Sequence, residues 1–342
     1  MNAKLALKTF ALGLAAGLLA SCATSPHAAA PQTTPAAVWP PPPDEPRIAC
    51  AQDIRGPRDI GQRPSAWRAV ANWITGDQGD SLNLRRPFAV ALDETGNLCI
   101  TDTDTRLLCY CDFARKRWRR HDGVGKTRFA SPVAVARRKG IFYVADSELA
   151  KVFAFRDDGR PVFEIGAPLK RPVGLAIDGD SLFVVDSQAH AVMVFGLDGK
   201  FQFRFGQRGT GPGEFNFPTC AAADGRGHLV VADTLNNRVQ VFDLHGNFLS
   251  QFGGNGDTSG HFARPKGVAV DATGHIYVVD AMFDNFQIFD PGGRLLLNVG
   301  ERGNGPGEFG LPNGIAIGAD NRIFVADAYN HRVQVFKYVG QP

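Results

Sequence analysis

A proline that opens one short apolar run and an aspartate that closes the next recur six times along this chain of 342 residues. Successive prolines are 45, 40, 46, 47 and 47 residues apart, and each aspartate follows its proline by fourteen or fifteen residues. Such a period is typical of an array of equivalent supersecondary units. A side chain present in every unit serves the unit, so function is sought where the repetition breaks. The pairs are Pro87/Asp102, Pro132/Asp146, Pro172/Asp186, Pro218/Asp233, Pro265/Asp280 and Pro312/Asp327.

Each unit has the pattern of a small antiparallel sheet. In residues 265–300, four runs rich in Val, Ile, Leu and Phe are separated by Gly, Asp or Pro, which favours strands over helices. Several runs, such as residues 229–232, are apolar at every position, so both faces of the sheet should be covered. A four-stranded sheet flanked by copies of itself is a propeller blade. The sequence therefore predicts an all-β, six-bladed β-propeller of four-stranded antiparallel blades.

The two ends of the chain should meet in the last blade. After Pro312 the sixth unit has only three strands, so a fourth must come from elsewhere. Residues 67–74, which precede the first proline, have the pattern of an outer strand such as residues 201–206. We therefore expect this N-terminal segment to complete the sixth blade and to leave no exposed sheet edge.

The wording of the repeats resembles the NHL family. Pro-x-Gly-x-Ala-x-Asp, Gly-x-Ile-Tyr-Val-x-Asp and the runs at residues 237–242 and 331–336 carry this resemblance, as do the Gly-rich connectors at residues 209–215 and 303–309. The likeness covers residues 62–340, and units 1 to 3 are the degenerate copies. It implies the propeller fold, and some intracellular NHL propellers bind RNA.

The N-terminus has the pattern of a bacterial lipoprotein signal. Lys4 and Lys8 precede an apolar stretch from residue 10 to 20, and Leu19-Ala-Ser-Cys22 resembles a lipobox with lipid attached at Cys22. The alternative is an ordinary secretory signal with a chance cysteine. Ala23 after the cysteine implies, by resemblance to such lipoproteins, sorting to the outer membrane, facing the periplasm or the exterior. The expected division is a signal peptide (1–22), a tether and lead-in rich in Pro and Ala (23–61) and the propeller (62–340).

Five further cysteines would lie in an oxidising compartment, where disulfides are allowed. Cys99 is near register with Cys109 and Cys111, so one cross-strand bridge to either is expected. Cys220 is expected to be a buried thiol of an inner strand. The CxxCH pattern of haem attachment and the spacing of zinc ligands are both missing.

A catalytic propeller would converge polar ligands on its central channel. Alignment of the six units places one residue of each at the channel mouth, and this ring is half apolar, with no carboxylate or histidine. We therefore expect no metal and no cofactor there, and a binding protein rather than an enzyme. The alternative is a metal-dependent hydrolase or lyase, lactonase-like or amidating-lyase-like. The ring comprises Phe88, Val133, Val173, Thr219, Lys266 and Asn313.

The remaining candidates for chemistry have structural interpretations. His190 and His331 share a repeat position, four residues after the aspartate, and we interpret both as turn residues. The repeated aspartates are expected to accept hydrogen bonds from turn amides, with Asp233 and Asp327 pairing with Arg238 and Arg332. No helix pattern follows the Gly-rich connectors, so they are not phosphate-binding loops.

Positive charge gathers in two neighbouring units. Residues 81–140 hold 13 Lys or Arg against 6 Asp or Glu, whereas the whole chain carries a formal net charge of only +3. Two turns of adjacent blades should open on the same face and form a basic patch with one tryptophan. It would suit a protein partner in the envelope, anionic lipid or lipopolysaccharide; a solvated surface is the alternative. Nucleic acid is not expected, because an exported lipoprotein rarely meets RNA. The patch comprises Arg115, Lys116, Arg117, Trp118, Arg119, Arg120, Arg137, Arg138 and Lys139.

Two hypotheses therefore stand side by side. The first is a lipid-anchored scaffold of the bacterial envelope that engages a protein partner or an anionic surface and has no chemistry of its own. The second is the channel enzyme that uses a metal ion.

Overall fold

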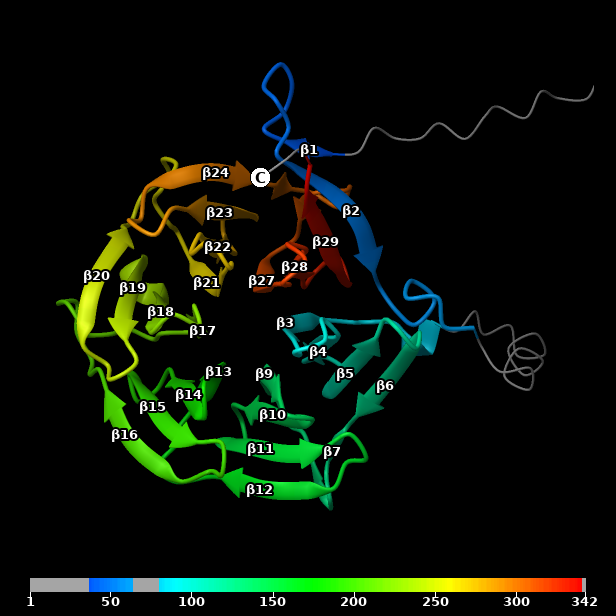
Figure 1. Ribbon diagram of the computed structural model, residues 1–342, viewed down its shortest axis with the longest axis vertical. Helices are drawn as coiled ribbons and strands as arrows, with labels where there is room; N and C mark the ends of the chain where they lie inside the picture. Colours follow the sequence, from blue (N-terminus) through cyan, green and yellow to red (C-terminus); the bar gives the residue numbers. More distant parts are fainter. Residues whose placement is uncertain (1–36, 64–79, 340–342) are drawn as a thin grey trace, which may run out of the picture. The chain divides into compact units, whose positions relative to one another are not determined.

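Six antiparallel sheets surround a central axis in the computed structural model, which describes residues 37–63 and 80–339 (Figure 1). This confirms the predicted all-β six-bladed propeller. In every blade the first strand lies nearest the axis and the fourth lies at the rim. The repeat unit of the sequence is therefore one blade.

The first three blades each consist of four consecutive strands. Blade 1 contains β3 (Pro87–Leu92), β4 (Leu98–Asp102), β5 (Leu107–Asp112) and β6 (Arg117–His121). Blade 2 contains β9 (Pro132–Arg138), β10 (Ile141–Asp146), β11 (Lys151–Arg156) and β12 (Pro161–Ile165). Blade 3 contains β13 (Pro172–Asp178), β14 (Ser181–Asp186), β15 (Ala191–Gly196) and β16 (Phe201–Phe205).

Blades 4 and 5 follow the same plan, and blade 6 combines both ends of the chain. Blade 4 contains β17 (Cys220–Ala223), β18 (His228–Asp233), β19 (Arg238–Asp243) and β20 (Phe248–Gly253). Blade 5 contains β21 (Pro265–Val270), β22 (Ile276–Asp280), β23 (Asn285–Phe289) and β24 (Leu295–Val299). Blade 6 contains β27 (Pro312–Ile317), β28 (Ile323–Asp327), β29 (Arg332–Tyr338), β2 (Ile48–Ile54) and β1 (Val38–Trp39).

The remaining elements are short. Two-residue strands pair as β7 (Gly123–Val124) with β8 (Thr127–Arg128) and as β25 (Glu301–Arg302) with β26 (Glu308–Phe309). Single 3₁₀ turns occur at η1 (Asp80–Leu82) and η2 (Thr234–Asn236). Within the described residues, no helix has the length and apolar character needed to cross a bilayer.

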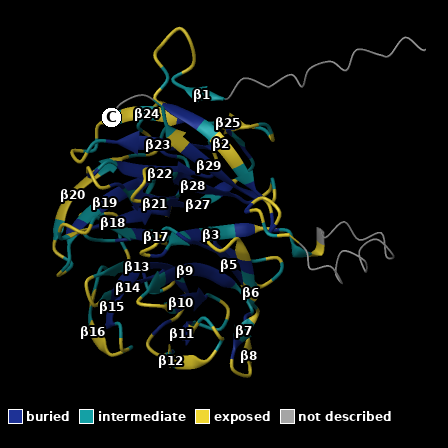
Figure 2. Cartoon of the chain, turned by 45° about the vertical axis from the view of Figure 1, so that its right-hand side comes forward, coloured by how far each residue is buried: buried dark blue, intermediate teal, exposed yellow. Residues whose placement is uncertain are grey.

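Burial follows from the position of each strand in its blade. The second strands β4, β18, β22 and β28 bury all or nearly all of their residues, because the neighbouring blades cover both faces. Outer strands are exposed at alternate positions, as in β24, and the rim is accordingly the most exposed part of each blade (Figure 2). The apolar runs of the sequence are thus the second and third strands.

The hub requires small residues two positions after each proline. A Cβ atom on Gly267 would lie 2.4 Å from the backbone oxygen of Asn313 in the next blade, and one on Gly314 would lie 2.8 Å from that of Phe88. Such contacts are closer than van der Waals packing allows. The Pro-x-Gly motif therefore lets the inner strands of adjacent blades approach each other. The six residues at this position are Ala89, Ala134, Gly174, Cys220, Gly267 and Gly314.

Each repeated aspartate fastens one end of its blade. The carboxylate of Asp280 is fully buried and accepts hydrogen bonds from the amides of Ala263 (2.7 Å) and Arg264 (3.1 Å), which precede the inner strand. It also accepts from Met282 (2.9 Å) in the hairpin turn that follows. At least one connector amide also donates to each of the other five aspartates. In blades 4 and 6 the donor from the hairpin is the side-chain amide of Asn236 or Asn330. The aspartates are therefore structural, as the repetition predicted.

A buried arginine and glutamine hold the Gly-rich connectors on blades 4 and 6. Arg238 pairs with Asp233 (2.9 Å) and donates to the carbonyl of Gly211 (2.8 Å) in the connector. Arg332 makes the equivalent ion pair with Asp327 (2.8 Å). Gln240 receives a hydrogen bond from the amide of Gly213 (2.9 Å). The two predicted ion pairs are confirmed, and the connectors serve as clamped turns.

The closing strand is β2, and the prediction that residues 67–74 fill this place is wrong. Residues 48–54 pair antiparallel with β29, whose other edge pairs with β28 (Figure 1). Ile48 and Ile54 are buried at 0% and 1% exposure against blade 6 and its neighbours. Residues 64–79 lie outside the described residues. The closing strand thus belongs to the segment that the sequence assigned to the lead-in, and an N-terminal strand does complete the last blade.

The expected disulfide is absent from the described residues, where all five cysteines are free. Cys99 lies directly opposite Tyr110, between Cys109 and Cys111. Because neighbouring residues of a strand point to opposite faces, both possible partners point away from Cys99. Cys220 lies in the inner strand, as expected, and is partly buried as a residue, with a thiol whose pKa burial raises.

We expect the closing strand to be essential for stability. Ile48→Ala should lower the free energy of unfolding by about 2–5 kcal/mol, because it opens a cavity between blades 5 and 6. Thermal or urea denaturation of the full-length protein measures this. Ala51→Ser, at an exposed position of the same strand, is the control and should change stability by less than about 0.5 kcal/mol. Equal stability of both variants would refute closure by residues 48–54.

Candidate functional site

The central channel contains a cavity of about 470 Å³. The six residues that the sequence placed at the channel mouth all line it: Phe88, Val133, Val173, Thr219, Lys266 and Asn313. Each comes directly after the repeated proline of its blade. In blade 4 this position, Thr219, lies just before the inner strand. The repeat alignment therefore located a real cavity, because six equivalent positions around one axis must face each other.

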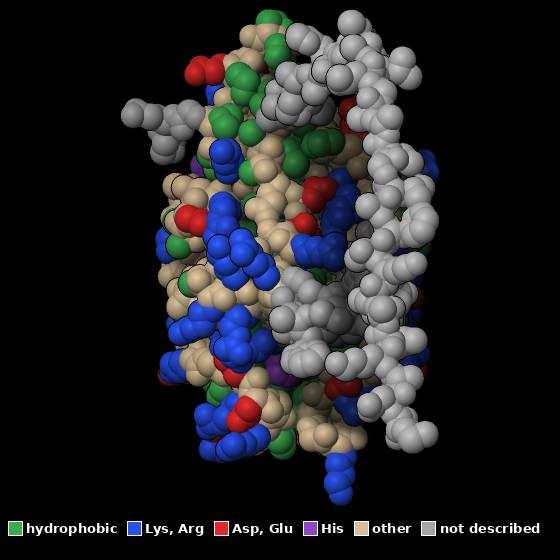
Figure 3. Space-filling view, turned by 90° about the vertical axis from the view of Figure 1, so that its right-hand side faces the viewer, with side chains coloured by type: hydrophobic (Ala, Val, Ile, Leu, Met, Phe, Trp, Pro, Cys, Tyr) green, Lys and Arg blue, Asp and Glu red, His purple; other side chains and the backbone are tan. Residues whose placement is uncertain are grey.

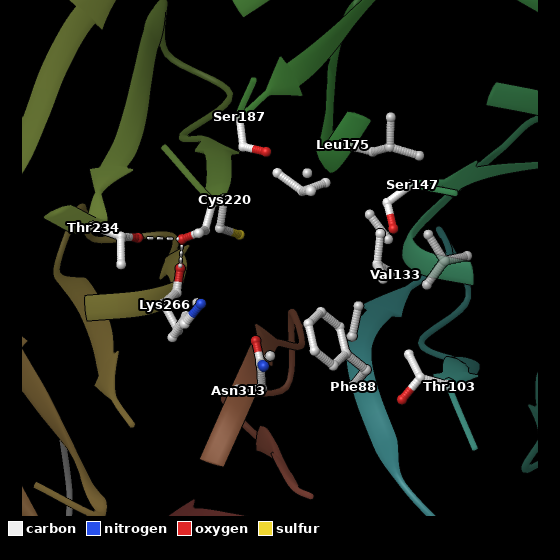
Figure 4. Close-up of a pocket in the computed structure, with 18 of the residues that line it drawn as sticks. Phe88, Thr103, Val133, Ser147, Leu175, Ser187, Cys220, Thr234, Lys266 and Asn313 are labelled. Atoms are coloured by element: carbon white, nitrogen blue, oxygen red, sulfur yellow. Dashed lines mark hydrogen bonds between the residues drawn. The ribbon is translucent and has the colours of Figure 1, made fainter. Parts of the chain in front are cut away.

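The six residues that directly follow the prolines divide between the two halves of the ring. Blades 1 to 3 contribute Phe88, Val133 and Val173, whereas blades 4 to 6 contribute a hydroxyl, an ammonium and an amide (Figure 4). The hydroxyl of Thr219 donates to the backbone oxygen of Lys266 (3.1 Å) and is within 2.7 Å of the Thr234 hydroxyl. The polar wall is therefore fixed by hydrogen bonds between blades 4 and 5.

The described residues that line the cavity include no carboxylate and no imidazole. Across residues 37–63 and 80–339, no group of three His, Cys, Asp or Glu side chains is arranged to hold a metal ion. A catalytic zinc or calcium site needs such donors. The polar groups of this cavity are instead amides, hydroxyls and cations.

Four cations line the cavity. We call three of them the cationic cluster: Lys266 of the polar wall, and Arg171 and Arg264, whose charges act on it from the connectors that enter blades 3 and 5. The fourth, Arg86, precedes blade 1. Burial, together with the charges of Arg264 and Arg171, lowers the pKa of Lys266 from its ordinary value near 10.5 to about 8. Within the described residues, none of the three pairs with a carboxylate. The cluster therefore has a positive charge that the protein does not balance locally.

A second feature lies on the face where the inner strands begin, which we call the front face. Five large apolar side chains are exposed there on blades 4 to 6, and we call them the apolar arc. Leu235, Met282 and Tyr329 each stand two residues after the repeated aspartate, with exposures of 50%, 55% and 55%. Phe217 and Leu311 each precede the repeated proline, at 38% and 39%.

The apolar arc was not predicted from the sequence, although the aligned repeats show a difference between the blades at this position. The equivalents of Leu235 in blades 1 to 3 are Asp104, Glu148 and Gln188, all exposed and polar. Comparing the six residues that follow each aspartate by two positions would therefore have separated the blades into a polar and an apolar half.

The shared histidine position joins neighbouring blades. The fourth residue after each aspartate has a positive φ of 50–58° in all six blades, which is the left-handed conformation of a tight turn. In four of the blades its side chain also bonds the connector to the next blade: His190 to Phe217, Asn237 to Ala263, Asp284 to Leu311 and His331 to Arg85. Both histidines are turn residues, as predicted, and they fix the backbone beneath the apolar arc.

The basic patch departs from its prediction in two side chains. Trp118 is only 8% exposed and packs into the core between blades 6 and 1. Arg137 is also largely buried, bound to Asp93 and to Asp157 (2.8 Å) and stacked on the Tyr110 ring at 4.5 Å. Trp118 faces inward because residues alternate along β6, and Arg137 is neutralised by acids from distant turns. Neither belongs to an exposed binding surface.

Carboxylates also pair with four of the other seven residues of the patch. Arg115 binds Asp112 (3.0 Å), Arg119 binds Asp157 (3.5 Å), Arg138 binds Glu94 (3.7 Å) and Lys139 binds Asp180 (2.9 Å). Arg119 and Arg137 share Asp157, so the structure does bring the two turns together. Lys and Arg side chains on the rim beside β6 and β2 are interspersed with Asp and Glu (Figure 3). Lys116, Arg117 and Arg120 remain exposed.

Comparison with known proteins agrees with the repeat architecture. The NHL repeat profile matches residues 215–242, 262–289 and 309–336, and a profile described as a 6-bladed beta-propeller matches residues 167–224. The chain therefore contains NHL repeats, and these lie in blades 4 to 6. No curated protein matches the chain.

Several solved structures share the fold at low sequence identity. A streptogramin B lyase is 13% identical with a TM-score of 0.57, covering 75% of this chain and 94% of its own. A virginiamycin B lyase from Staphylococcus aureus is 12% identical with a TM-score of 0.56, covering 75% and 96%. A protein of unknown function from Bacteroides thetaiotaomicron is 17% identical with a TM-score of 0.57, covering 76% and 71%. At such identities the likeness shows the fold alone.

We expect Trp118 to support stability rather than binding. Trp118→Ala should reduce the free energy of unfolding by about 3–5 kcal/mol, the usual cost of emptying a large aromatic site in a core. Arg117→Ala, its exposed neighbour on β6, is the matched control and should stay within about 0.5 kcal/mol of the unchanged protein. Chemical denaturation measures both. If Trp118→Ala were as stable as the unchanged protein, the conclusion that Trp118 packs in the core would be contradicted.

Proposed function

We propose that this NHL-repeat propeller is a binding protein of the cell envelope that docks a protein partner on the apolar arc of its front face. The observation that carries the proposal is the concentration of apolar exposure. Among the described residues, nine large apolar side chains are exposed, and five of them form the arc. The other four stand singly on the outer strands of blades 2 to 5: Val162, Phe201, Leu249 and Leu296. Clustered apolar exposure marks interaction sites, whereas single apolar residues are ordinary.

The chemistry of the arc suits a protein surface. Phe, Met, Tyr and Arg are enriched in protein interfaces. Tyr329 is accompanied by Arg86, whose guanidinium lies 5.2 Å from the centre of its ring. Arg264 stands at the equivalent position between Phe217 and Leu311, so arginine is present within the arc as well.

The arc is also held rigidly before any partner arrives. The amide of Leu311 donates to Asp284 (2.7 Å), and the amide of Met282 donates to Asp280 (2.9 Å). The first bond fixes the hairpin of blade 5 to the connector that enters blade 6, and the second fixes the hairpin of blade 5 itself. A preorganised surface loses little conformational entropy on association, which favours binding.

The basic patch supports binding less strongly. Five of its nine side chains already pair with carboxylates, and Trp118 is buried. Screened, compensated charges contribute little to affinity. Contact with anionic lipid or lipopolysaccharide would therefore rest on Lys116, Arg117 and Arg120.

A channel hydrolase or lyase has less support than a binding role. The lyases that share this fold are only 12–13% identical to the chain. The described lining of the channel lacks the acids and imidazoles that would hold a metal ion. We therefore do not extend their activity to this protein.

The cellular location in the proposal rests on the sequence of residues 1–36, which lie outside the described residues. Lipid on Cys22 would anchor the propeller to the outer membrane. Mass spectrometry of the mature N-terminus should find a lipid-modified Cys22; an unmodified cysteine, or cleavage elsewhere, would remove the anchor from the proposal.

Photo-crosslinking in intact cells tests the docking surface. A photoreactive amino acid at Met282 or at Leu235 should capture one defined partner, because both side chains lie on the arc. The same amino acid at Leu249, which is equally exposed at 49% on an outer strand, is the matched control and should capture none. Mass spectrometry identifies the captured protein.

The captured partner is then purified and titrated against the full-length protein. Leu235→Glu and Met282→Glu should each weaken its affinity at least tenfold, because a charge must be desolvated in the interface. Leu249→Glu should leave the affinity unchanged. Equal crosslinking at the rim, or an affinity insensitive to the two arc variants, would contradict the proposal.

A further inference from the structure

The channel cavity has two walls of opposite chemistry. Its apolar wall comes from Phe88, Val133 and Val173 of blades 1 to 3. Its polar wall carries Lys266 and Asn313, whose side chains point into the cavity (Figure 4). A ligand that satisfies both walls must have an apolar part and a polar part.

Lys266 of the polar wall differs from the buried cations of this protein. The buried arginines Arg137, Arg238 and Arg332 all pair with at least one carboxylate. Lys266 is half-buried, whereas Arg171 and Arg264 are exposed, and among the described residues no carboxylate pairs with any of the three. Partly buried cations normally have a counterion, because their desolvation is costly.

The neighbouring groups show what the missing counterion must be. Arg171 and Arg264 act on Lys266 strongly enough to help burial lower its pKa to about 8. The nearby Cys220 does not supply a negative charge, since burial raises the pKa of its thiol. Placing one anion among these three positive charges would be strongly favourable, because the cavity is partly shielded from water.

We propose that the channel cavity binds a small amphipathic carboxylate, with its carboxylate at Lys266 between Arg171 and Arg264 and its apolar chain against Phe88, Val133 and Val173. The volume of about 470 Å³ is within the range of small-molecule sites. Guanidinium groups bind carboxylates through paired hydrogen bonds, which would give this end of the ligand its orientation. This site goes beyond partner docking, because the proposed docking surface does not require a ligand in the channel.

The shape of the lining favours this ligand class over larger anions. A nucleic acid or a polyphosphate would bring several charges, but the ring of residues that directly follow the prolines holds one cation, Lys266, and is apolar in blades 1 to 3. Burying a second charge against Phe88 and Val133 would be costly. A single carboxylate on an apolar chain matches both walls.

Calorimetric titration with octanoate tests the site in the full-length protein. We expect one molecule to bind per chain. Octylammonium, which has the same chain with the opposite charge, should not bind measurably, and 1-octanol should bind at least tenfold more weakly. No heat with octanoate, or equal binding of octylammonium, would overturn the proposal.

Variants of the polar wall locate the binding. Lys266→Met keeps the length of the side chain without its charge and should weaken octanoate binding at least tenfold. Lys126→Met, at an exposed turn outside the channel, is the matched control and should not change it. If Lys266→Met lowers the melting temperature too far for titration, Arg171→Gln takes its place with the same expectation. Unchanged affinity in a folded variant would refute the site.

The pH dependence gives an independent test. An anion favours the protonated form of Lys266, so octanoate affinity should fall as the pH rises through about 8. Burial raises the pKa of the nearby Cys220 thiol, so this thiol ionises less readily than an ordinary cysteine. An octanoate affinity that does not change between pH 7 and 9.5 would count against the role of Lys266.

Partner crosslinking at Met282 should be unchanged in the Lys266→Met variant. This result separates failure of the channel site from failure of the docking surface.

Discussion

The buried aspartate at the front end of every blade is the contact on which the rest of the structure depends. Its carboxylate accepts amide hydrogen bonds from the connector that enters the blade and from the hairpin that follows the second strand, as Asp280 does with Ala263 and Met282. A carboxylate is needed because several donors converge on one buried point. The result is a rigid front face whose turns project side chains at repeated positions. Variation in those side chains can then create a binding surface without disturbing the fold.

The ring is symmetric in its backbone and divided in its surface chemistry. Blades 4 to 6 contain the three matched NHL repeats, the arginine and glutamine clamps of blades 4 and 6, and the apolar arc. Blades 1 to 3 carry Asp104, Glu148 and Gln188 at the positions of the arc. Inside the channel the division is reversed, since the apolar wall comes from blades 1 to 3. Blades 4 to 6 therefore carry the docking surface and Lys266, while Arg171 of the cationic cluster precedes the inner strand of blade 3.

The sequence predicted the features that are local and periodic. It did not predict which strand closes the ring, because long-range pairing decides that. The blades, the ring from Phe88 to Asn313 and the role of the aspartates follow from a repeat that every copy reinforces. The closing strand does not: residues 48–54 and 67–74 both have a strand pattern, and only pairing with β29, almost 290 residues away, selects the first. The disulfide prediction was wrong by one residue of register: Cys99 lies opposite Tyr110, so Cys109 and Cys111 point to the other face of the sheet. The burial of Trp118 could have been predicted, because alternation along β6 points its side chain inward.

Hydrogen-exchange mass spectrometry of the full-length protein with and without its captured partner tests the central claim most directly. The account predicts slower exchange in the connectors and hairpins of blades 4 to 6 at residues 216–217, 235, 282, 311 and 329, which all lie on the front face. Slower exchange confined to the turns at residues 113–117 and 138–141 would place the partner on the basic patch and would contradict the account.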